Sequence, residues 1–145
     1  MPNHMRLECD AISENELFAR NAVALFVLPL GPDVSELSDI KTAVSEAVTN
    51  CIVHAYRGQG GTIGLECTLE ERTIHIKITD KGRGIPDVEQ AIQPFYTTLP
   101  DEERSGMGFT IMRTFMSDFK VESALGVGTT VFMSKAIGAG KKENA

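Results

Sequence analysis

The 145-residue chain is long enough for one domain with a hydrophobic core that needs no disulfide. Its 20 acidic and 14 basic residues give a net charge of −6, which argues against direct binding to a nucleic-acid backbone or to an anionic membrane surface. The three cysteines, Cys9, Cys51 and Cys67, fall on expected apolar faces, so we interpret them as reduced core thiols and not as disulfide partners or metal ligands.

The N-terminal segment predicts a strand followed by a helix. Residues 5–9 alternate between apolar and charged side chains, which is the period of a half-buried strand. Ser13-Glu-Asn-Glu16 fits a capping box and predicts a helix from Glu14 to about Leu28. This helix is apolar over most of its circumference, which predicts burial on more than one side. Two alternatives stay open: a core helix packed between layers, or a helix at a subunit interface.

A second helix, expected from Val34 to Tyr56 after a D-x-x-E cap at residues 33–36, is the central element of the predicted fold. Its polar face carries Glu46, Asn50 and His54, which form a row because residues four apart on a helix lie nearly above one another. The opposite face is apolar or small at helical spacing: Leu37, Ile40, Val44, Ala47, Val48, Cys51, Ile52 and Ala55. A carboxylate and an amide therefore point the same way from a helix anchored in the core.

The rest of the chain predicts two hairpins and a helix. Residues 63–69 and 74–78 alternate between apolar and polar side chains, which indicates a hairpin with one buried face. Residues 109–117 have helical spacing, and residues 119–124 and 129–133 form a second hairpin around a glycine-containing turn.

Antiparallel strand pairs with helices between them predict an α+β fold. We expect a two-layer α/β sandwich with the helices on one face of a mixed, mostly antiparallel sheet. Residues 1–137 are expected to form a single domain, and residues 138–145 a disordered tail.

Two glycine-rich segments, Asp80-Lys-Gly-Arg-Gly84 and Ser105-Gly-Met-Gly108, flank a long proline-containing stretch of lid-like length. Glycine lets a backbone approach phosphate oxygens closely, and the second segment precedes a helix whose N-terminus favours anions. Neither segment is a P-loop or a dinucleotide fingerprint, because the required spacings are absent. Each motif alone is more often a turn, and only the order of the motifs indicates a nucleotide site.

That order is E-x-x-x-N on a helix, D-x-G-x-G after a strand, G-x-G before a helix, and a closing G-x-G-T-T strand. It resembles the nucleotide site of the gyrase, Hsp90, histidine-kinase and MutL ATPase superfamily, over about residues 5–135. Residues 13–20, 40–50 and 103–112 look like the small anti-sigma serine kinases, in particular the anti-sigma-F family of spore-forming bacteria. The resemblance implies a Bergerat-type ATP-binding fold and a cytoplasmic homodimer. It also implies that the protein binds the sporulation sigma factor, sigma-F, and phosphorylates a serine of an anti-anti-sigma partner with ATP and Mg²⁺.

The resemblance also implies residue roles. Glu46 would be the general base for the attacking serine, Asn50 would supply an oxygen to Mg²⁺, and Asp80 would accept a hydrogen bond from the adenine amino group. Arg20 would contact the partner proteins, although on the residues alone it is a solvated helix charge. The remaining implied positions contact the base or the phosphates: Gly82, Gly84, Ser105, Gly106, Met107, Gly108 and Thr130.

Two positions depart from the family pattern. Ala55 stands where these relatives tend to have glycine, and Leu99 stands where they tend to have lysine. Losing a lid cation leaves the nucleotide phosphates less neutralised, so we expect turnover or lid closure to differ while binding persists.

Three other functions are weighed. A relative that regulates the general-stress sigma factor would have the same chemistry and a different partner. A protein that uses ATP only as a switch for partner binding would have no need of Glu46 as a base. A histidine-kinase catalytic fragment is disfavoured, because the sequence shows no upstream dimerisation helices or phosphoacceptor segment.

Overall fold

The computed structural model describes residues 2–85, 87–92 and 108–138. The Leu99 position, the glycine-rich residues Ser105, Gly106 and Met107, and the expected tail beyond Gly138 lie outside these residues. The elements in chain order are β1 (Asn3–Asp10), α1 (Glu14–Phe26), the 3-10 helix η1 (Leu28–Leu30), α2 (Val34–Asn50), the π-helix η2 (Cys51–Ala55), β2 (Thr62–Glu70), β3 (Thr73–Asp80), α3 (Val88–Ile92), α4 (Gly108–Phe115), β4 (Asp118–Ala124) and β5 (Gly128–Ala136).

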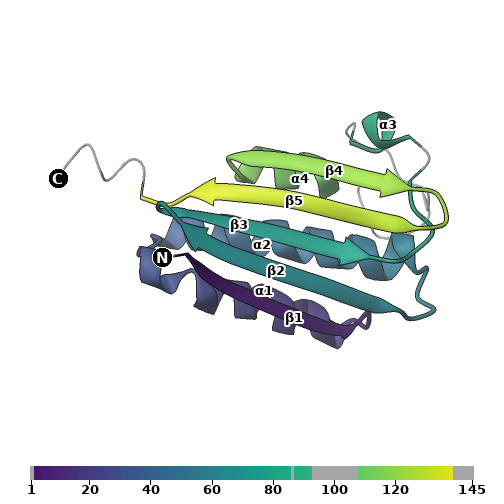
Figure 1. Ribbon diagram of the computed structural model, residues 1–145, viewed down its shortest axis with the longest axis horizontal. Coiled ribbons are helices and arrows are strands. Elements are labelled where there is room, and N and C mark those ends of the chain that lie inside the picture. The colour runs from purple at the N-terminus through teal and green to yellow at the C-terminus, as the bar shows by residue number, and fades with distance from the viewer. Residues whose placement is uncertain (1, 86, 93–107, 139–145) are drawn as a thin grey trace.

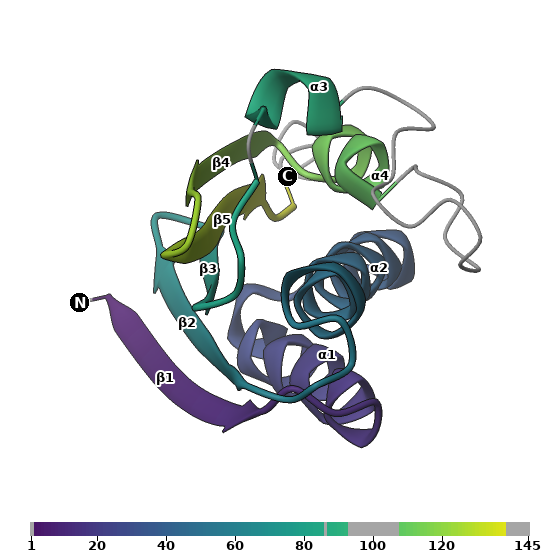
Figure 2. The same ribbon diagram turned by 90° about the vertical axis from the view of Figure 1, so that its right-hand side faces the viewer.

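The five strands form one sheet in the order β1-β2-β3-β5-β4, and every pairing is antiparallel. Helices α1, α2 and α4 lie on one face of this sheet, with α2 between the other two (Figures 1 and 2). The predicted α+β two-layer sandwich is confirmed. The sheet is simpler than expected, since the described strands include no parallel pair.

The core lies between the sheet and the helices, as the alternation along the strands predicts. On β3 every second side chain is buried, and its outward neighbours His75 and Lys77 are exposed. Helix α2 contributes the largest set of buried helical side chains, which places its polar residues at the margin of the core. The fully buried large side chains are Val23, Val27, Ile40, Val44, Val48, Ile63, Leu65, Ile74, Ile76, Ile78, Met112 and Ile137.

The two predicted helix caps have different outcomes. The Asp33 capping box is confirmed, because the Glu36 amide donates to Asp33 Oδ1 over 2.7 Å and the Asp33 amide donates to Glu36 Oε1 over 3.0 Å. The Ser13 capping box is wrong: Ser13 makes no side-chain cap hydrogen bond. Its backbone already has helical angles (φ −54°, ψ −39°), whereas a capping side chain needs an extended residue at that position.

Helix α1 is buried on one side only within the single chain. Ala19, Val23 and Ala24 face the core, whereas Leu17, Phe18 and Leu25 are each more than half exposed. The expectation of burial on more than one side is therefore wrong for the isolated chain. The alternative that this helix lies at a subunit interface stays a prediction.

All three cysteines are free thiols that point toward the helix layer or lie within it. Burial raises the pKa of the Cys67 thiol to about 12, so this thiol stays protonated and unreactive. No helix in the described part of the chain is long and apolar enough to cross a membrane.

Candidate functional site

The last turn of the central helix differs from the straight row that the sequence predicts. Asn50 is the final residue of α2, and residues Cys51–Ala55 continue as a π-helix, closed by a bond from the Tyr56 amide to the Cys51 carbonyl of 3.1 Å. Glu46 and Asn50 remain one α-helical turn apart, and both are half-buried. His54 lies within this π-helical turn and not in a continuous α-helix. Single π-turns of this kind occur frequently at functional sites.

Asp80 ends β3 and is buried, with 6% of its surface exposed. Its Oδ1 accepts hydrogen bonds from the Gly82 amide (2.9 Å) and the Thr129 amide (3.2 Å), and the Cys51 thiol makes a further side-chain hydrogen bond. Burial raises the pKa of Asp80 above its ordinary value, and the three hydrogen bonds, which favour the ionised form, oppose this shift. The hydrogen bonds to Oδ1 hold the carboxylate in one orientation inside the fold.

The loop after Asp80 lies directly against the end of the central helix. The Arg83 amide donates to the Ala55 carbonyl over 3.2 Å, and the Arg83 Nε donates to the His54 carbonyl over 3.0 Å. A Cβ on Gly82 would lie 2.6 Å from both the Cβ and the carbonyl oxygen of Ala55, so glycine is required at this close approach.

On its other side the same loop is held by the second hairpin. The Gly126 amide donates to the Arg83 carbonyl over 2.9 Å, and the Ile85 amide donates to Ser123 Oγ over 2.7 Å. Gly84 has a positive φ of 78°, and a Cβ there would overlap the Ala124 carbonyl. The D-x-G-x-G loop is therefore fixed between the helix layer and the β4–β5 turn.

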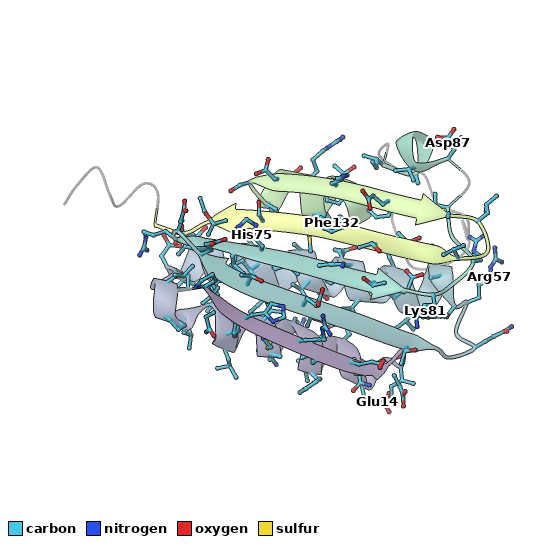
Figure 3. All side chains as sticks on the ribbon, viewed as in Figure 1. Glu14, Arg57, His75, Lys81, Asp87 and Phe132 are labelled. Carbon is cyan, nitrogen blue, oxygen red and sulfur yellow. The ribbon has the colours of Figure 1, made fainter. Side chains whose placement is uncertain are left out.

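Tyr56 joins the helix end to the sheet. Its hydroxyl donates to the Thr62 carbonyl (2.7 Å) and accepts from the Lys81 amide (2.6 Å). These contacts gather the ends of η2, β2 and β3 at one end of the molecule, which Figure 3 marks with Arg57 and Lys81. The predicted residues Glu46, Asn50, Asp80, Gly82 and Gly84 thus come from elements that converge at this end.

Other predicted residues lie elsewhere. Gly108 begins α4, and Arg20 lies on α1, where it forms an ion pair of 3.5 Å with Glu16.

The side chain of Thr130 lies on the outer face of the sheet. Thr130 pairs with Thr79 and Glu122, so the sheet does not bring its side chain to Asp80. Thr129 stands opposite Asp80 and is buried. Sequence reasoning missed Thr129, although the strand alternation that buries Val131 and Met133 also predicts an inward Thr129.

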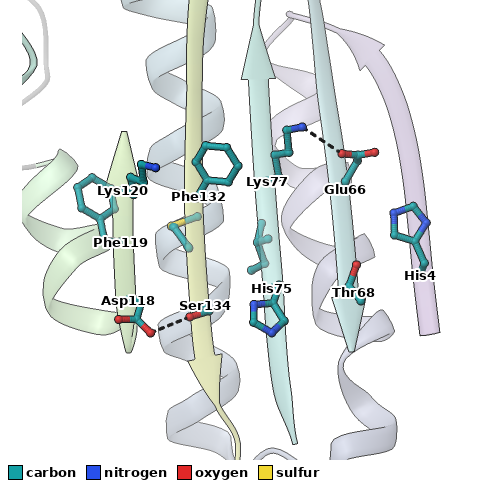
Figure 4. Close-up of a pocket in the computed structure, with 12 residues that line it drawn as sticks. His4, Glu66, Thr68, His75, Lys77, Asp118, Phe119, Lys120, Phe132 and Ser134 are labelled. Carbon is teal, nitrogen blue, oxygen red and sulfur yellow. Dashed lines mark hydrogen bonds and ion pairs between the residues drawn. The ribbon is translucent and has the colours of Figure 1, made fainter. Parts of the chain in front are cut away.

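A depression on the outer face of the sheet is separate from this site (Figure 4). Phe132 lies at its centre, with Lys77 and Lys120 each 5.8 Å from the ring centroid. Lys77 also pairs with Glu66 over 3.6 Å, and Ser134 Oγ donates to Asp118 over 3.3 Å. These charges are largely compensated among themselves, and the helix α2, which carries Glu46 and Asn50, lies on the other face of the sheet.

Comparisons with known proteins show the family to which the chain is related. The family described as histidine kinase-like ATPase domain matches residues 14–135. The anti-sigma F factor of Caldanaerobacter subterraneus subsp. tengcongensis is 52% identical over 94% of this chain and 95% of its own length. The anti-sigma F factor of Geobacillus kaustophilus is 50% identical over 97% of each chain.

Solved structures share the fold at lower identity. The RsbU and RsbW domains of Rv1364c from Mycobacterium tuberculosis superpose with a TM-score of 0.65 at 20% identity, over 94% of this chain and 32% of that one. The catalytic domain of the histidine kinase ThkA superposes with a TM-score of 0.58 at 15% identity, over 92% of this chain and 96% of that one. By its nearly full-length identity to those relatives and its ATPase-domain match, this chain belongs to the anti-sigma F factor family of histidine kinase-like ATPase domains.

Proposed function

We propose that the protein is an ATP-dependent serine kinase that phosphorylates an anti-anti-sigma protein, and an anti-sigma factor that binds sigma-F as a homodimer in the cytoplasm. The observation that carries the proposal is the position of Glu46 and Asn50, one turn apart on α2, directly before the turn that touches Asp80 and the Gly82 loop. Relatives named anti-sigma F factor at about half identity support the partner class. Residues 1–137 would act as one unit.

The residues fit an adenine nucleotide. An ionised carboxylate has about four acceptor sites, and two amides and one thiol occupy three of them at Asp80. One acceptor is left for the exocyclic amino group of a base. Gly82 and Gly84 let the backbone run close to that base without side chains of their own. Asp80 would therefore recognise adenine, while Ser105 to Gly108 would hold phosphates.

The residues also fit Mg²⁺ held mainly by phosphate. No group of three His, Cys, Asp or Glu side chains suited to a metal occurs within the described ranges. Mg²⁺ in nucleotide sites takes one or two protein oxygens and completes its shell with phosphate and water, so the Asn50 amide oxygen suffices. When bound, Mg-ATP supplies the phosphoryl group and the metal charge.

Glu46 would accept the proton of the attacking serine hydroxyl. Phosphoryl transfer depends mainly on positioning and on neutralising charge, so one carboxylate beside the metal ligand completes the requirement. A protein that used ATP only as a switch would have no use for a base at this place.

The α1 face would supply the partner surface. Leu17, Phe18 and Leu25 expose apolar area beside Arg20, and a cluster of exposed large apolar residues with an arginine is typical of a protein interface. This face lies on α1, away from the Asp80 loop, so partner contact and nucleotide contact use different elements (Figure 2).

The test is phosphorylation of the candidate anti-anti-sigma protein with radiolabelled ATP, comparing the parent with Glu46→Gln. The amide keeps the size and helix position of the side chain but removes the base, so we expect the rate to fall by about 10²- to 10⁴-fold. Binding of Mg-ATP and of sigma-F, measured by calorimetry, should stay close to the parental values.

Each other outcome has a distinct meaning. A parental rate in Glu46→Gln would show that Glu46 is not the base. Sigma and ATP binding without phosphorylation by the parent would favour the ATP-switched protein. Binding of the general-stress sigma factor in preference to sigma-F would favour the general-stress regulator.

A further inference from the structure

One residue of the loop after Asp80, Arg83, holds the end of the helix layer with two of its own donors. Its side-chain Nε donates to the His54 carbonyl over 3.0 Å, and its backbone amide donates to the Ala55 carbonyl over 3.2 Å. These carbonyls belong to the last two residues of η2, and His54 lies 29 residues before Arg83 in the chain. The two contacts therefore join segments that are far apart in the sequence.

The carbonyl end of a helix needs donors from outside the helix. The last carbonyls have no later amide of the same helix to bind, and a carbonyl without a donor away from water costs free energy. The Arg83 guanidinium supplies a charged donor at this end, where the helix dipole favours a cation. Arg83, His54 and Ala55 are all half-buried, so water competes less for these bonds than at an exposed helix end.

Arg83 is also held from the side of the second hairpin. Its carbonyl accepts from the Gly126 amide over 2.9 Å, which ties the residue to the turn between β4 and β5. The backbone contacts of Arg83 are available to any residue except proline, whereas the bond to the His54 carbonyl needs this side chain. Substitution at position 83 therefore removes one contact between the loop and the helix end and leaves the backbone groups in place.

The two halves of the proposed nucleotide site lie on the two segments that Arg83 joins. Asn50, the proposed Mg²⁺ ligand, directly precedes η2 and is continuous with it. Asp80 and Gly82, which would face the base, lie in the loop that carries Arg83. A nucleotide with its base at the loop and its metal at the helix must span both segments, so its affinity depends on how firmly the protein holds them together before binding.

We propose that Arg83 is a positioning residue, whose guanidinium holds the proposed base-binding loop against the helix that carries the proposed metal ligand. The inference rests on the proposed nucleotide site and deepens it. By fixing the spacing of the two segments, Arg83 sets how much Mg²⁺ strengthens the binding of ATP.

The test measures the dissociation constant of ATP by calorimetry, with Mg²⁺ and with EDTA, for the parent, Arg83→Met and Arg83→Gln. The two variants are a matched pair, because both lose the positive charge and only Arg83→Gln has a donor nitrogen at the position of Nε. The parent should bind ATP at least about tenfold more tightly with Mg²⁺ than with EDTA. We call this ratio the Mg²⁺ advantage.

Arg83→Met should reduce the Mg²⁺ advantage by about three- to tenfold, because the loop and the helix end lose a charged hydrogen bond. The affinity for ATP in EDTA should stay close to the parental value, since the base half of the site keeps its own contacts. Arg83→Gln should give a Mg²⁺ advantage between those of the parent and Arg83→Met, because a neutral donor is about half as strong as a charged one.

Hydrogen exchange in the nucleotide-free protein reports the contact itself. In Arg83→Met the backbone amide of residue 83 should exchange faster than in the parent. The Tyr56 amide, which is bonded to the Cys51 carbonyl across η2, should keep its protection. If Arg83→Met does not fold, Arg83→Leu also lacks a donor and should show the same two effects.

An unchanged Mg²⁺ advantage in the donor-free variant, or equal losses of ATP affinity with and without Mg²⁺, would overturn the positioning role of Arg83. Equal values in Arg83→Met and Arg83→Gln would assign the change to the lost charge and overturn the role of the donor. If the parent showed no Mg²⁺ advantage, the proposed metal role of Asn50 would fail first and the role of Arg83 with it.

Discussion

At the residue scale, the candidate site contains the buried carboxylate of Asp80, whose charged form is disfavoured by burial. Burial raises the pKa of Asp80 despite the hydrogen bonds from Gly82, Thr129 and Cys51. A carboxylate whose pKa is higher in the folded state stabilises the fold below its unfolded pKa. That contribution is lost as the pH rises through the folded pKa. At neutral pH the ionised Asp80 therefore lowers the free energy of unfolding, which is consistent with the proposed role of Asp80 in binding.

Asp80→Asn should separate stability from recognition. Without nucleotide, the variant should unfold at an equal or higher urea concentration than the parent at pH 7, because the buried charge is gone. Its stability should also lack the decrease that Asp80 imposes as the pH rises from about 4. ATP affinity should fall by about 10- to 100-fold, since an amide can meet the adenine amino group donor to donor.

The matched control for Asp80→Asn is Asp118→Asn, at an exposed position on the outer face of the sheet. ATP affinity should remain parental there. Equal binding of ATP and GTP by the parent protein would count against Asp80 as the adenine acceptor.

At the element scale, the central contact is that of the Gly82 loop with the end of the helix layer. Gly82→Ala should weaken ATP binding at least about tenfold and lower the free energy of unfolding by about 1–3 kcal/mol, because the new Cβ forces the loop away from Ala55. Calorimetry and urea denaturation measure the two effects.

Ala55→Gly should not rescue Gly82→Ala. The Ala55 carbonyl oxygen lies as near to the added Cβ as the Ala55 side chain does, and the carbonyl carbon lies 2.8 Å from it, so removing the side chain relieves one of the three overlaps. Gly64→Ala on β2 is the control, because its nearest neighbour would be 3.8 Å from the new Cβ. Restoration of ATP binding in the double variant would place the obstruction in the Ala55 side chain alone.

The sequence predicted those elements whose periodicity is long and one-sided. Strands β1, β2 and β3 and helix α2 follow from alternation and helical spacing, because one buried face imposes a repeat on the residues themselves. The Ser13 cap failed because a short motif competes with local backbone geometry that only the whole fold decides. The helix α3 at Val88–Ile92 was not predicted, since five residues are too few to show a period.

The sequence indicated which residues form the candidate site, but it did not indicate how the backbone arranges them. Motif order indicated Asp80, Gly82 and Asn50, but nothing in the local sequence indicates that the helix changes to a π-turn at Cys51. The contact of the Gly82 loop with the end of that turn joins residues far apart in the chain. Thr130 stays a prediction, and the sheet register adds that Thr129, one residue earlier, is the side chain on the buried face beside Asp80.

At the scale of the whole molecule, the sandwich has one covered and one open sheet face, and the two proposed functional surfaces lie on different parts of the helix layer. The residues proposed to bind nucleotide gather at one end of the helix layer. The apolar residues exposed on α1 form the outer side of that layer, and the charged face of the sheet lies opposite (Figure 2). A partner on α1 can therefore bind without covering the Asp80 loop.

Arg20→Glu tests whether partner binding on α1 is separate from nucleotide binding at the Asp80 loop. Arg20 is 36% exposed by side chain and pairs with Glu16 on the same helix, so its reversal replaces an attraction by a repulsion at spacing i, i+4. That local change costs a few tenths of a kcal/mol of helix stability, which the fold tolerates. Loss of a cation at a partner interface should instead weaken sigma-F binding at least about tenfold, with ATP affinity unchanged.

The matched charge reversal is Lys77→Glu, on the outer face of the sheet, where the side chain is exposed and pairs with Glu66. Because this face lies across the sheet from α1, sigma-F affinity should stay parental in that variant, as measured by calorimetry at two salt concentrations. A parental sigma affinity in Arg20→Glu would return Arg20 to a solvated helix charge. Equal losses in both variants would indicate a general effect of net charge, since each reversal moves the chain from −6 to −8. If sigma-F affinity falls only in Arg20→Glu, and falls less at high salt than at low salt, the partner binds on the outer side of α1.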